Sequence, residues 1–329
     1  MTVLVLGAGG FLGLNVVDAL LARGEAPRCG RRRRSNVLGL RARKVDLVTA
    51  DLDQPAELRA AMAGCDVVIH AAGHYPRFSF DRAGAIATGL RQMRNVLDAV
   101  ASSGVRRLVY VSSVATAAPA PSGTSDESSV YGAAPGLGTY HDLKWEMERL
   151  ALCEDRFEVS VACPGACLGP WDWRVGTSAL FVALARGLDP RHPDGVINPV
   201  DARDVAEALV RMARVRAPPR RVLLAAGNHR LHDLLVSLAR RYGVARVSPP
   251  MPAGEALRFA DAEEQRAARE GGRPALSREI ADLVVHGVAL DARLAASALG
   301  LRFRPLEETL QAADAFARKM RFIPSEVGP

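Results

Sequence analysis

The sequence predicts an α/β protein: a doubly wound parallel sheet that carries a smaller C-terminal substrate lobe. Short runs of β-branched and aliphatic residues alternate with helical stretches through the first half of the chain. A glycine-rich turn joins the first of these runs to the first helix. After about residue 170 the alternation gives way to helices separated by segments rich in Pro, Gly and charge.

The elements of the first half follow from apolar spacing. Buried strands are expected at 2–6, 45–52, 65–72, 106–113 and 157–164. Helices are expected between them at 11–23, 55–64, 89–104 and 139–152. The second strand should fall at 25–30, although Pro27 and Gly30 suit a strand poorly. Because strands and helices alternate, the strands are expected to be parallel.

The second half of the chain predicts mostly helices. One is expected at 200–215 and another at 232–243, with a strand at 220–227 between them that returns to the sheet. The stretch 249–275 is rich in Pro, Gly and charge and predicts a mobile helical or loop segment. Two helices around a Gly–Pro break are expected over 290–320.

Composition narrows the class of protein. Hydrophobic residues make up 49% and charged residues 24%, as in ordinary globular proteins. The formal net charge of +7 admits an anionic partner, but aromatic residues at 5% argue against a base-stacking surface, and we expect no nucleic-acid partner. Five cysteines with no CxxC pair fit a reducing compartment and predict no metal site. Without a basic leader or an apolar run of about 18–20 residues, we expect a cytoplasmic protein with no transmembrane segment.

The stretch LVLGAGGFLG places Gly7, Gly10 and Gly13 after a strand and at the start of a helix. A turn without side chains lets backbone N–H groups approach a pyrophosphate, and the helix N-terminus adds a positive dipole. The strand before and the helix after are the context that this motif needs. The pattern therefore predicts a Rossmann-type domain that binds NAD(P).

The domain boundaries follow from this motif. We expect the NAD(P)-binding Rossmann domain over 1–170 and mainly a substrate-binding lobe over 171–329. Part of the second half, about 196–228, should return to the Rossmann domain.

The stretch RCGRRRRSN, residues 28–36, falls where a Rossmann domain usually has a carboxylate for the cofactor's ribose. Arg31 and Arg32 stand there instead, with the next two arginines as solvated neighbours. A guanidinium can form a charge-assisted fork with a 2′-phosphate, which a carboxylate would repel. The sequence therefore favours NADP(H) over NAD(H). Asp51, after the third strand, either accepts from the adenine amino group or caps its own loop.

Three residues predict acid–base chemistry at one substrate oxygen. Ser113 ends a predicted strand, and Tyr140 and Lys144 share one face of a predicted helix. A free tyrosine titrates at about 10, and an ammonium close by favours its phenolate. Tyr140 could then pass a proton to or from the substrate while hydride moves to or from a nicotinamide, with Ser113 holding the same oxygen. The alternative is an ordinary helical pair, which the glycine turn earlier in the chain makes less probable.

At these residues the chain resembles the extended short-chain dehydrogenases/reductases of the NAD-dependent epimerase/dehydratase superfamily. It is most similar to the dihydroflavonol-reductase-like and 3β-hydroxysteroid-dehydrogenase-like members. The matching segments are GAGGFLG, ADL, HAAG, RRLVYVSSVAT, YHDLK, CPGACLGPWD and LGLRFRPLEETL. The resemblance implies catalytic roles for Ser113, Tyr140 and Lys144.

The resemblance also implies cofactor contacts. Ala71, Ala72 and Gly73 would border the adenosine ribose, and Pro164 and Ala166 would hold the nicotinamide carboxamide by their backbones. Together with the residues above, the expected cofactor-binding set is Gly7, Gly9, Gly10, Phe11, Leu12, Arg31, Arg32, Asp51, Leu52, Ala71, Ala72, Gly73, Val111, Tyr140, Lys144, Pro164 and Ala166.

Two positions depart from the family pattern. Gly89 stands where the family usually has an asparagine, which removes a polar helper of the proton relay. Cys163–Pro164 replaces the Arg-Pro or Asn-Pro of sugar-nucleotide and flavonol enzymes, which argues for a less polar pocket.

The segments HAAGHYPRF and GPWDWR should open onto the crevice beyond the strand ends. His74, Tyr75, Trp171 and Trp173 are therefore candidate walls for an aromatic or polycyclic substrate. For each, an ordinary packing role in its loop or in the lobe is the alternative.

Together these patterns predict an NAD(P)H-dependent oxidoreductase that interconverts a ketone and a secondary alcohol on a hydrophobic small molecule. A sugar-nucleotide epimerase or dehydratase is the first alternative, although SSVAT and CPGACLG lack the usual signatures of those enzymes. A non-catalytic NADP(H)-sensing regulator is the second, and retention of Tyr140 argues against it. A homodimer is compatible with the sequence.

Overall fold

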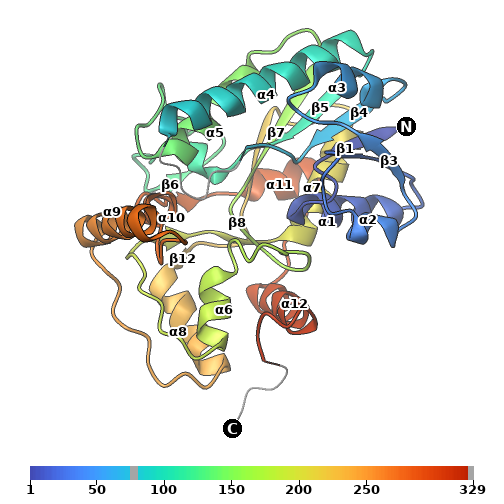
Figure 1. Cartoon of the computed structure of the whole chain (residues 1–329). Helices are drawn as coiled ribbons and strands as arrows, with labels where there is room; N and C mark the ends of the chain where they lie inside the picture. Colours follow the sequence, from blue (N-terminus) through green and yellow to red (C-terminus); the bar gives the residue numbers. More distant parts are fainter. Residues whose placement is uncertain (75–80, 325–329) are drawn as a thin grey trace.

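The computed structural model describes residues 1–74 and 81–324 (Figure 1). Within these residues the centre is a seven-stranded parallel sheet in the order β11-β7-β5-β4-β1-β2-β3. Its strands are β1 (Val3–Leu6), β2 (Arg28–Arg31), β3 (Asp46–Thr49), β4 (Val67–His70), β5 (Arg107–Val111), β7 (Glu158–Pro164) and β11 (Arg221–Leu224). The strand order reverses between β1 and β4, which is where ligands bind in open parallel sheets.

Helices cover both faces of the sheet (Figure 1). Side chains alternate along β1, so Val3 and Val5 pack into one apolar core while Leu4 and Leu6 pack into the other. The first core is closed by α1 (Phe11–Leu21), α2 (Leu38–Arg41), α7 (Ala202–Arg214) and α11 (Arg293–Leu299). The second is closed by α3 (Pro55–Met62), α4 (Arg82–Ser102) and α5 (Thr139–Leu152). The fold class predicted from the sequence is therefore confirmed.

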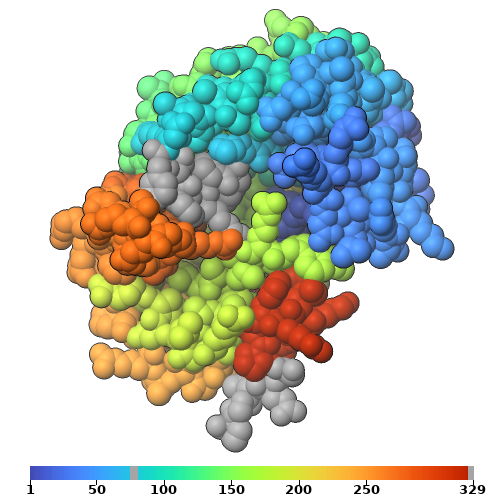
Figure 2. Space-filling view, in the orientation of Figure 1, coloured from blue at the N-terminus to red at the C-terminus, as the bar shows by residue number. Residues whose placement is uncertain are grey.

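The C-terminal lobe lies beyond the carboxyl ends of the strands. Its helices are α6 (Ala179–Ala185), α8 (Leu231–Arg241), α9 (Ala253–Glu270), α10 (Arg278–Val285) and α12 (Leu306–Lys319). Short strand pairs connect it to the sheet: β8 (Ala166–Leu168) with β10 (Pro199–Asp201), β9 (Val196–Ile197) with β12 (His229–Arg230), and β6 (Thr124–Ser125) with β13 (Ala289–Leu290). Figure 2 shows the N-terminal half in blue, cyan and green at one end of the molecule and the lobe in yellow-green, orange and red at the other.

The chain crosses between the two parts more than once. After the first segments of the lobe, α7 packs against α1, and β11 then pairs with β7 at the edge of the central sheet. The lobe is thus joined to the Rossmann sheet by packing as well as by the chain.

One local prediction needs correction. The second strand is displaced toward the arginines and ends at Arg31, because Gly30 fits between Leu6 and Ala50, where a Cβ would meet side-chain atoms at 3.1 and 3.2 Å. For 249–275 the helical alternative holds, since most of this stretch forms helix α9. Its buried face consists of alanines, among them Ala256 and Ala260, so the apolar stripe is weak in sequence. None of the helices in the described part is long and apolar enough to cross a membrane.

Candidate active site

The glycine turn presents bare backbone at the switch between β1 and β4. A Cβ on Gly7, whose φ is +78°, would lie 2.8 Å from the amide nitrogen of Ala72. A Cβ on Gly13 would lie 2.1 Å from the carbonyl oxygen of Gly7, so only glycine lets α1 start this close to the strand. The N-cap of α1, Gly10, provides no side-chain cap. This cradle, which side chains would fill, fits the pyrophosphate of a dinucleotide.

The arginine run continues from β2 beside the glycine turn, because Gly30 pairs with Leu6 of β1. The Nε of Arg31 is buried and has no hydrogen-bond partner among the described residues. Its Nη1 donates to the carbonyl oxygens of Arg32 and Arg33 at 3.4 and 3.2 Å. Arg32 itself is exposed. The structure therefore places Arg31 and Arg32 next to the glycine turn.

The rest of this loop is anchored on both sides. Arg33 pairs with Glu57 at 3.0 Å while its side chain stays 80% exposed. Farther on, the carbonyl oxygen of Asn36 lies against Gly9, where a Cβ would have only 3.2 Å. Phe11 and Leu12 begin α1 and pack partly against the first apolar core. The arginine loop and the glycine turn thus lie side by side.

On the adenosine side, Asp51 accepts a hydrogen bond from the N–H of Asp53 at 3.1 Å. It therefore caps its own loop, as one of the two sequence interpretations has it, through one carboxylate oxygen. Leu52 is buried, and its carbonyl oxygen accepts from Asn95 at 2.8 Å. Ala71, Ala72 and Gly73 follow β4, and the first two contact the glycine turn.

The three predicted catalytic residues lie at the carboxyl end of β5 and on α5, which packs against the turn after β5. Ser113 caps the short 3₁₀ helix Val114–Thr116, its hydroxyl oxygen accepting from an N–H of that turn at 3.2 Å. The Nζ of Lys144 donates to the carbonyl oxygen of Val111 at 3.1 Å and lies 5.9 Å from the ring centroid of Tyr140. Burial lowers the pKa of Lys144 to about 8, so the ammonium form still predominates at neutral pH.

A buried ion pair lies one helical turn beyond Lys144. Glu148 accepts from the Nε of Arg221 on β11 at 2.7 Å, and both side chains are about 5–6% exposed. The other carboxylate oxygen of Glu148 accepts from the hydroxyls of Ser112 and Thr116. These bonds tie the end of β5, helix α5 and strand β11 together next to the residues predicted to be catalytic.

Sequence reasoning missed this pair. Glu148 follows Tyr140 and Lys144 at the same four-residue spacing, which places it on their helix face and was a usable signal. Arg221 has no comparable signal, because it comes from a strand more than seventy positions later that only the fold brings alongside.

Gly89 stands where the family usually has an asparagine, and neighbouring side chains fill the space around it. Gly89 on α4 faces Leu143 of α5, and a Cβ there would lie 2.5 Å from a methyl carbon of that leucine. Leu143 is fully buried. Gly89 thus lets α4 and α5 approach closely near the predicted catalytic residues, where a larger side chain would not fit without movement.

The segment expected to hold the nicotinamide follows β7. Pro164 ends β7 and Ala166 begins β8, with Gly165 between them. The N–H of Ala166 already donates to the carbonyl oxygen of Asn198 at 2.8 Å. Burial raises the pKa of the Cys163 thiol, which donates to a carboxylate oxygen of Glu148 at 3.4 Å and so faces the buried ion pair.

The predicted substrate residues differ in their contacts and in their exposure. The indole N–H of Trp171 donates to Asp18 of α1 at 3.0 Å, and Arg43 lies over its ring at 4.4 Å. Trp173 is 39% exposed and lies 5.4 Å, centroid to centroid, from Phe316 of α12. His74 is half-buried after β4, and Tyr75 lies outside the described residues. A substrate contact from any of these remains a prediction.

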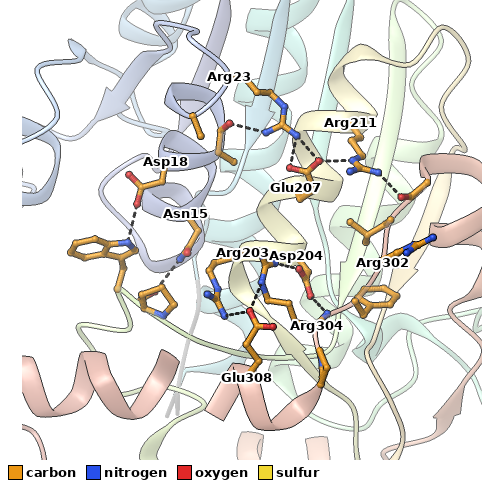
Figure 3. Close-up of a pocket in the computed structure, with 18 residues that line it drawn as sticks. Asn15, Asp18, Arg23, Arg203, Asp204, Glu207, Arg211, Arg302, Arg304 and Glu308 are labelled. Carbon is orange, nitrogen blue, oxygen red and sulfur yellow. Dashed lines mark hydrogen bonds and ion pairs between the residues drawn. The ribbon is translucent and has the colours of Figure 1, made fainter. Parts of the chain in front are cut away.

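A separate hollow of about 750 Å³ lies between α1, α7 and the segment 300–308 (Figure 3). Its walls carry paired charges: Glu207 binds both Arg23 and Arg211, and Asp204 binds Arg304. Of the predicted site residues that the structure describes, Trp171 alone lines it. This hollow belongs to the joint between helices and the C-terminal segment, away from Ser113, Tyr140 and Lys144.

No group of three or more His, Cys, Asp and Glu side chains within 1–74 and 81–324 could hold a metal ion.

Comparison with known proteins places this site in a family. The model of the NAD-dependent epimerase/dehydratase family matches residues 3–171. A putative dihydroflavonol 4-reductase of Synechocystis sp. is 28% identical over 93% of this chain and 91% of its own length. Sterol demethylase protein B of Methylococcus capsulatus is 34% identical over 56% of this chain and 58% of its own.

Solved structures agree on the fold. The yeast methylglyoxal/isovaleraldehyde reductase Gre2, complexed with NADPH, superposes with a TM-score of 0.73 at 19% identity, covering 98% of this chain and 100% of that one. Other structures of the same fold were determined with NAD. The chain therefore belongs to the NAD-dependent epimerase/dehydratase family, as an extended short-chain dehydrogenase/reductase and an NAD(P)(H)-dependent oxidoreductase.

Proposed function

We propose that this enzyme interconverts a ketone and a secondary alcohol on a hydrophobic, cyclic or aromatic small molecule, with NADP(H) preferred over NAD(H). The observation that carries the proposal is the placement of the Lys144 ammonium, held at the carbonyl oxygen of Val111 and 5.9 Å from the ring of Tyr140. Ser113 lies two residues after Val111, the last residue of the strand that supplies this carbonyl. An acid–base tyrosine beside a cationic lysine is what carbonyl reduction requires.

The side chains divide the chemistry as follows. When bound, the nicotinamide supplies or accepts the hydride. Tyr140 donates a proton to the carbonyl oxygen in reduction and takes it back from the alcohol in oxidation. The positive charge of Lys144 favours the phenolate that remains after donation. Ser113 orients the substrate oxygen by a hydrogen bond.

The proton-transfer role is tested by Tyr140→Phe. We expect turnover to fall by about 10²–10⁴-fold, because the ring stays and the proton donor is lost. Binding of NADPH, measured as the shift in melting temperature with ligand concentration, should stay at the wild-type value. Full activity in this variant would refute the mechanism.

The preference for NADP(H) rests on Arg31 and Arg32. Both lie at the end of β2 beside the glycine turn, and the guanidinium of Arg31 has a buried Nε with no partner among the described residues. A 2′-phosphate would satisfy such donors with charge-assisted bonds. The proposal is that these two arginines read the phosphate.

A matched pair of double variants tests this. Replacing Arg31 and Arg32 with alanine should weaken NADPH binding at least tenfold and leave NADH binding within about twofold. Replacing Arg33 and Arg34 with alanine removes the same charge and should change neither by more than about twofold. Fluorescence titration of each cofactor gives the dissociation constants, and equal losses from both variants would reduce the effect to general electrostatics.

The substrate class is proposed from three features. Cys163–Pro164 stands in place of the Arg-Pro or Asn-Pro of sugar-nucleotide and flavonol enzymes, and Trp173 leaves part of its ring exposed beside the lobe. The relatives named above are a putative dihydroflavonol reductase and a sterol demethylase protein, whose names point to ring systems.

Screening of cyclic and aromatic ketones against NADPH consumption, with nucleotide sugars as the opposing panel, decides between the substrate classes. Conversion of a nucleotide sugar with no net consumption of cofactor would favour an epimerase or dehydratase instead.

A further inference from the structure

The catalytic helix α5 begins without a cap from its own segment. Its N-cap is Gly138, which has no side chain to accept from the first N–H groups of the helix. The first and second helical residues are Thr139 and Tyr140, so one of the uncapped N–H groups belongs to the catalytic tyrosine itself. Both residues are buried, which denies these N–H groups to bulk water.

A carboxylate from the C-terminal lobe takes these N–H groups instead. Glu279 on α10 accepts from the N–H of Tyr140 at 2.8 Å and from the N–H of Thr139 at 3.2 Å, one with each oxygen. Its side chain is buried as well. Gly138 has a φ of +137°, and a Cβ there would lie 3.2 Å from Glu279 and 2.9 Å from Asp282. The bare N-cap is therefore what lets α10 approach.

The helix that carries Glu279 is itself braced. Arg278, the preceding residue, binds Asp261 of α9 at 3.0 Å and Asp282 of α10 at 3.0 Å. The ion pair with Asp261 fixes α10 on α9, so Glu279 meets α5 from a helix that is held in place.

We propose that Glu279 is a positioning residue for Tyr140, so that the C-terminal lobe holds the catalytic tyrosine through its main chain. A carboxylate at a helix N-terminus is favoured both by charge-assisted hydrogen bonds and by the helix dipole. Losing it frees the first turn of α5, and small displacements of a catalytic group lower the rate steeply. The inference rests on the proposed function, because it takes Tyr140 as the proton donor.

The test compares Glu279→Ala and the milder Glu279→Gln with Glu264→Gln. All three alter a carboxylate that accepts a backbone N–H at a helix start, but Glu264 contacts α10 and not α5. In the reductase assay we expect kcat to fall about tenfold for Glu279→Ala and less for Glu279→Gln. The KM for substrate and the dissociation constant of NADPH should stay within about twofold, and Glu264→Gln should keep the wild-type kcat.

Hydrogen exchange supplies a reading that needs no substrate. The amides of Thr139 and Tyr140, resolved by NMR or by fragmentation mass spectrometry, should exchange at least tenfold faster in both Glu279 variants than in the wild type and in Glu264→Gln. Unchanged exchange and unchanged kcat would overturn the inference, as would an equal loss in Glu264→Gln. If no ketone is turned over, the proposed function fails while the exchange experiment still reports whether Glu279 holds Tyr140.

Discussion

Two groups of arginines lie on either side of the candidate site, in opposite surroundings. Arg221 on β11 is buried, and its guanidinium donates to Glu148, to Thr116 and to the main chain of Glu127. The run Arg31 to Arg34 follows a strand at the other side of the sheet, where Arg33 is 80% exposed. A buried charge must be fully paired, whereas an exposed one can change partners cheaply. The same residue type therefore acts as a structural tie in one place and as a candidate ligand reader in the other.

Burial also determines how each side responds to its medium. Around Arg221 and Glu148, desolvation lowers the pKa values of His70 and Lys144 and raises that of Tyr110. The exposed run is open to salt, which screens charges over about 8 Å at physiological ionic strength. We therefore expect the free energy of unfolding to depend on pH and on mutation at the buried side, and on salt concentration at the exposed side.

The largest expected effect comes from Arg221→Ala. Removal of one partner leaves Glu148 charged and buried, so the free energy of unfolding should fall by about 3–5 kcal/mol. Urea unfolding followed by circular dichroism measures it.

The double variant Glu148→Leu/Arg221→Met provides the control. It removes both charges and should recover much of the stability, because an apolar pair of similar volume replaces the ion pair. If Arg221→Ala is as stable as the wild type, the Arg221–Glu148 pair contributes no more than a surface ion pair. The contrast between the buried and the exposed arginines would then be wrong.

The second effect is a pH dependence centred on His70, which ends β4 with both ring nitrogens buried and without partners among the described residues. Burial lowers its pKa to about 3, from an ordinary value of 6.5. Between these values the unfolded chain binds a proton that the folded chain does not, so stability falls as the pH drops from about 6.5 toward 3. His70→Leu should reduce the loss of unfolding free energy between pH 6.5 and 4.5 by about 2 kcal/mol.

Two other groups titrate in the same pH range. Both are present in the wild type and in His70→Leu, so their contributions to the free energy of unfolding cancel in the difference between the two proteins. His141, whose pKa burial lowers to about 4, loses stability over the same acid range in both proteins. Asp282, whose pKa burial raises to about 6, has the opposite sign, since its stabilising effect is lost as the pH rises through 6. Parallel pH curves for wild type and His70→Leu would contradict the assignment to His70.

The sequence predicts features that depend on neighbouring residues and misses those that depend on contacts between distant segments. The glycine turn and the Tyr140–Lys144 spacing are local patterns, and each predicts its own surroundings. The second strand lies at Arg28–Arg31 and not at the predicted 25–30. Gly30 packs against Leu6 and Ala50, and the sequence alone does not show these contacts. Arg221 and Glu279 reach the catalytic helix from distant segments, so their roles depend on tertiary structure. Trp171 stays a predicted substrate wall, and a pattern of aromatic residues could not show that Asp18 accepts from its indole N–H.

A third effect tests how tightly the buried side is packed. Gly89→Asn would place a Cβ 2.5 Å from Leu143, and the added amide has no room beside a fully buried leucine. We expect a loss of about 1–3 kcal/mol in unfolding free energy, as for other overpacked cores. The difference between Ala87→Gly and Ala87→Asn on the exposed face of the same helix controls for helix propensity and should favour Asn by about 0.3 kcal/mol. A stabilised Gly89→Asn protein would mean that α4 and α5 can separate, and that the buried side is softer than the comparison assumes.

The smallest expected effect is on the exposed side, where Arg33 and Glu57 form an ion pair at 3.0 Å. Arg33→Ala should lower the unfolding free energy by less than about 1 kcal/mol, because water already solvates most of the guanidinium. In 1 M salt, where the screening length is about 3 Å, the difference from the wild type should vanish. Urea unfolding at low and high salt measures both values. A salt-independent loss of several kcal/mol would place Arg33 among the structural arginines, and the contrast would then rest on Arg31 and Arg32 alone.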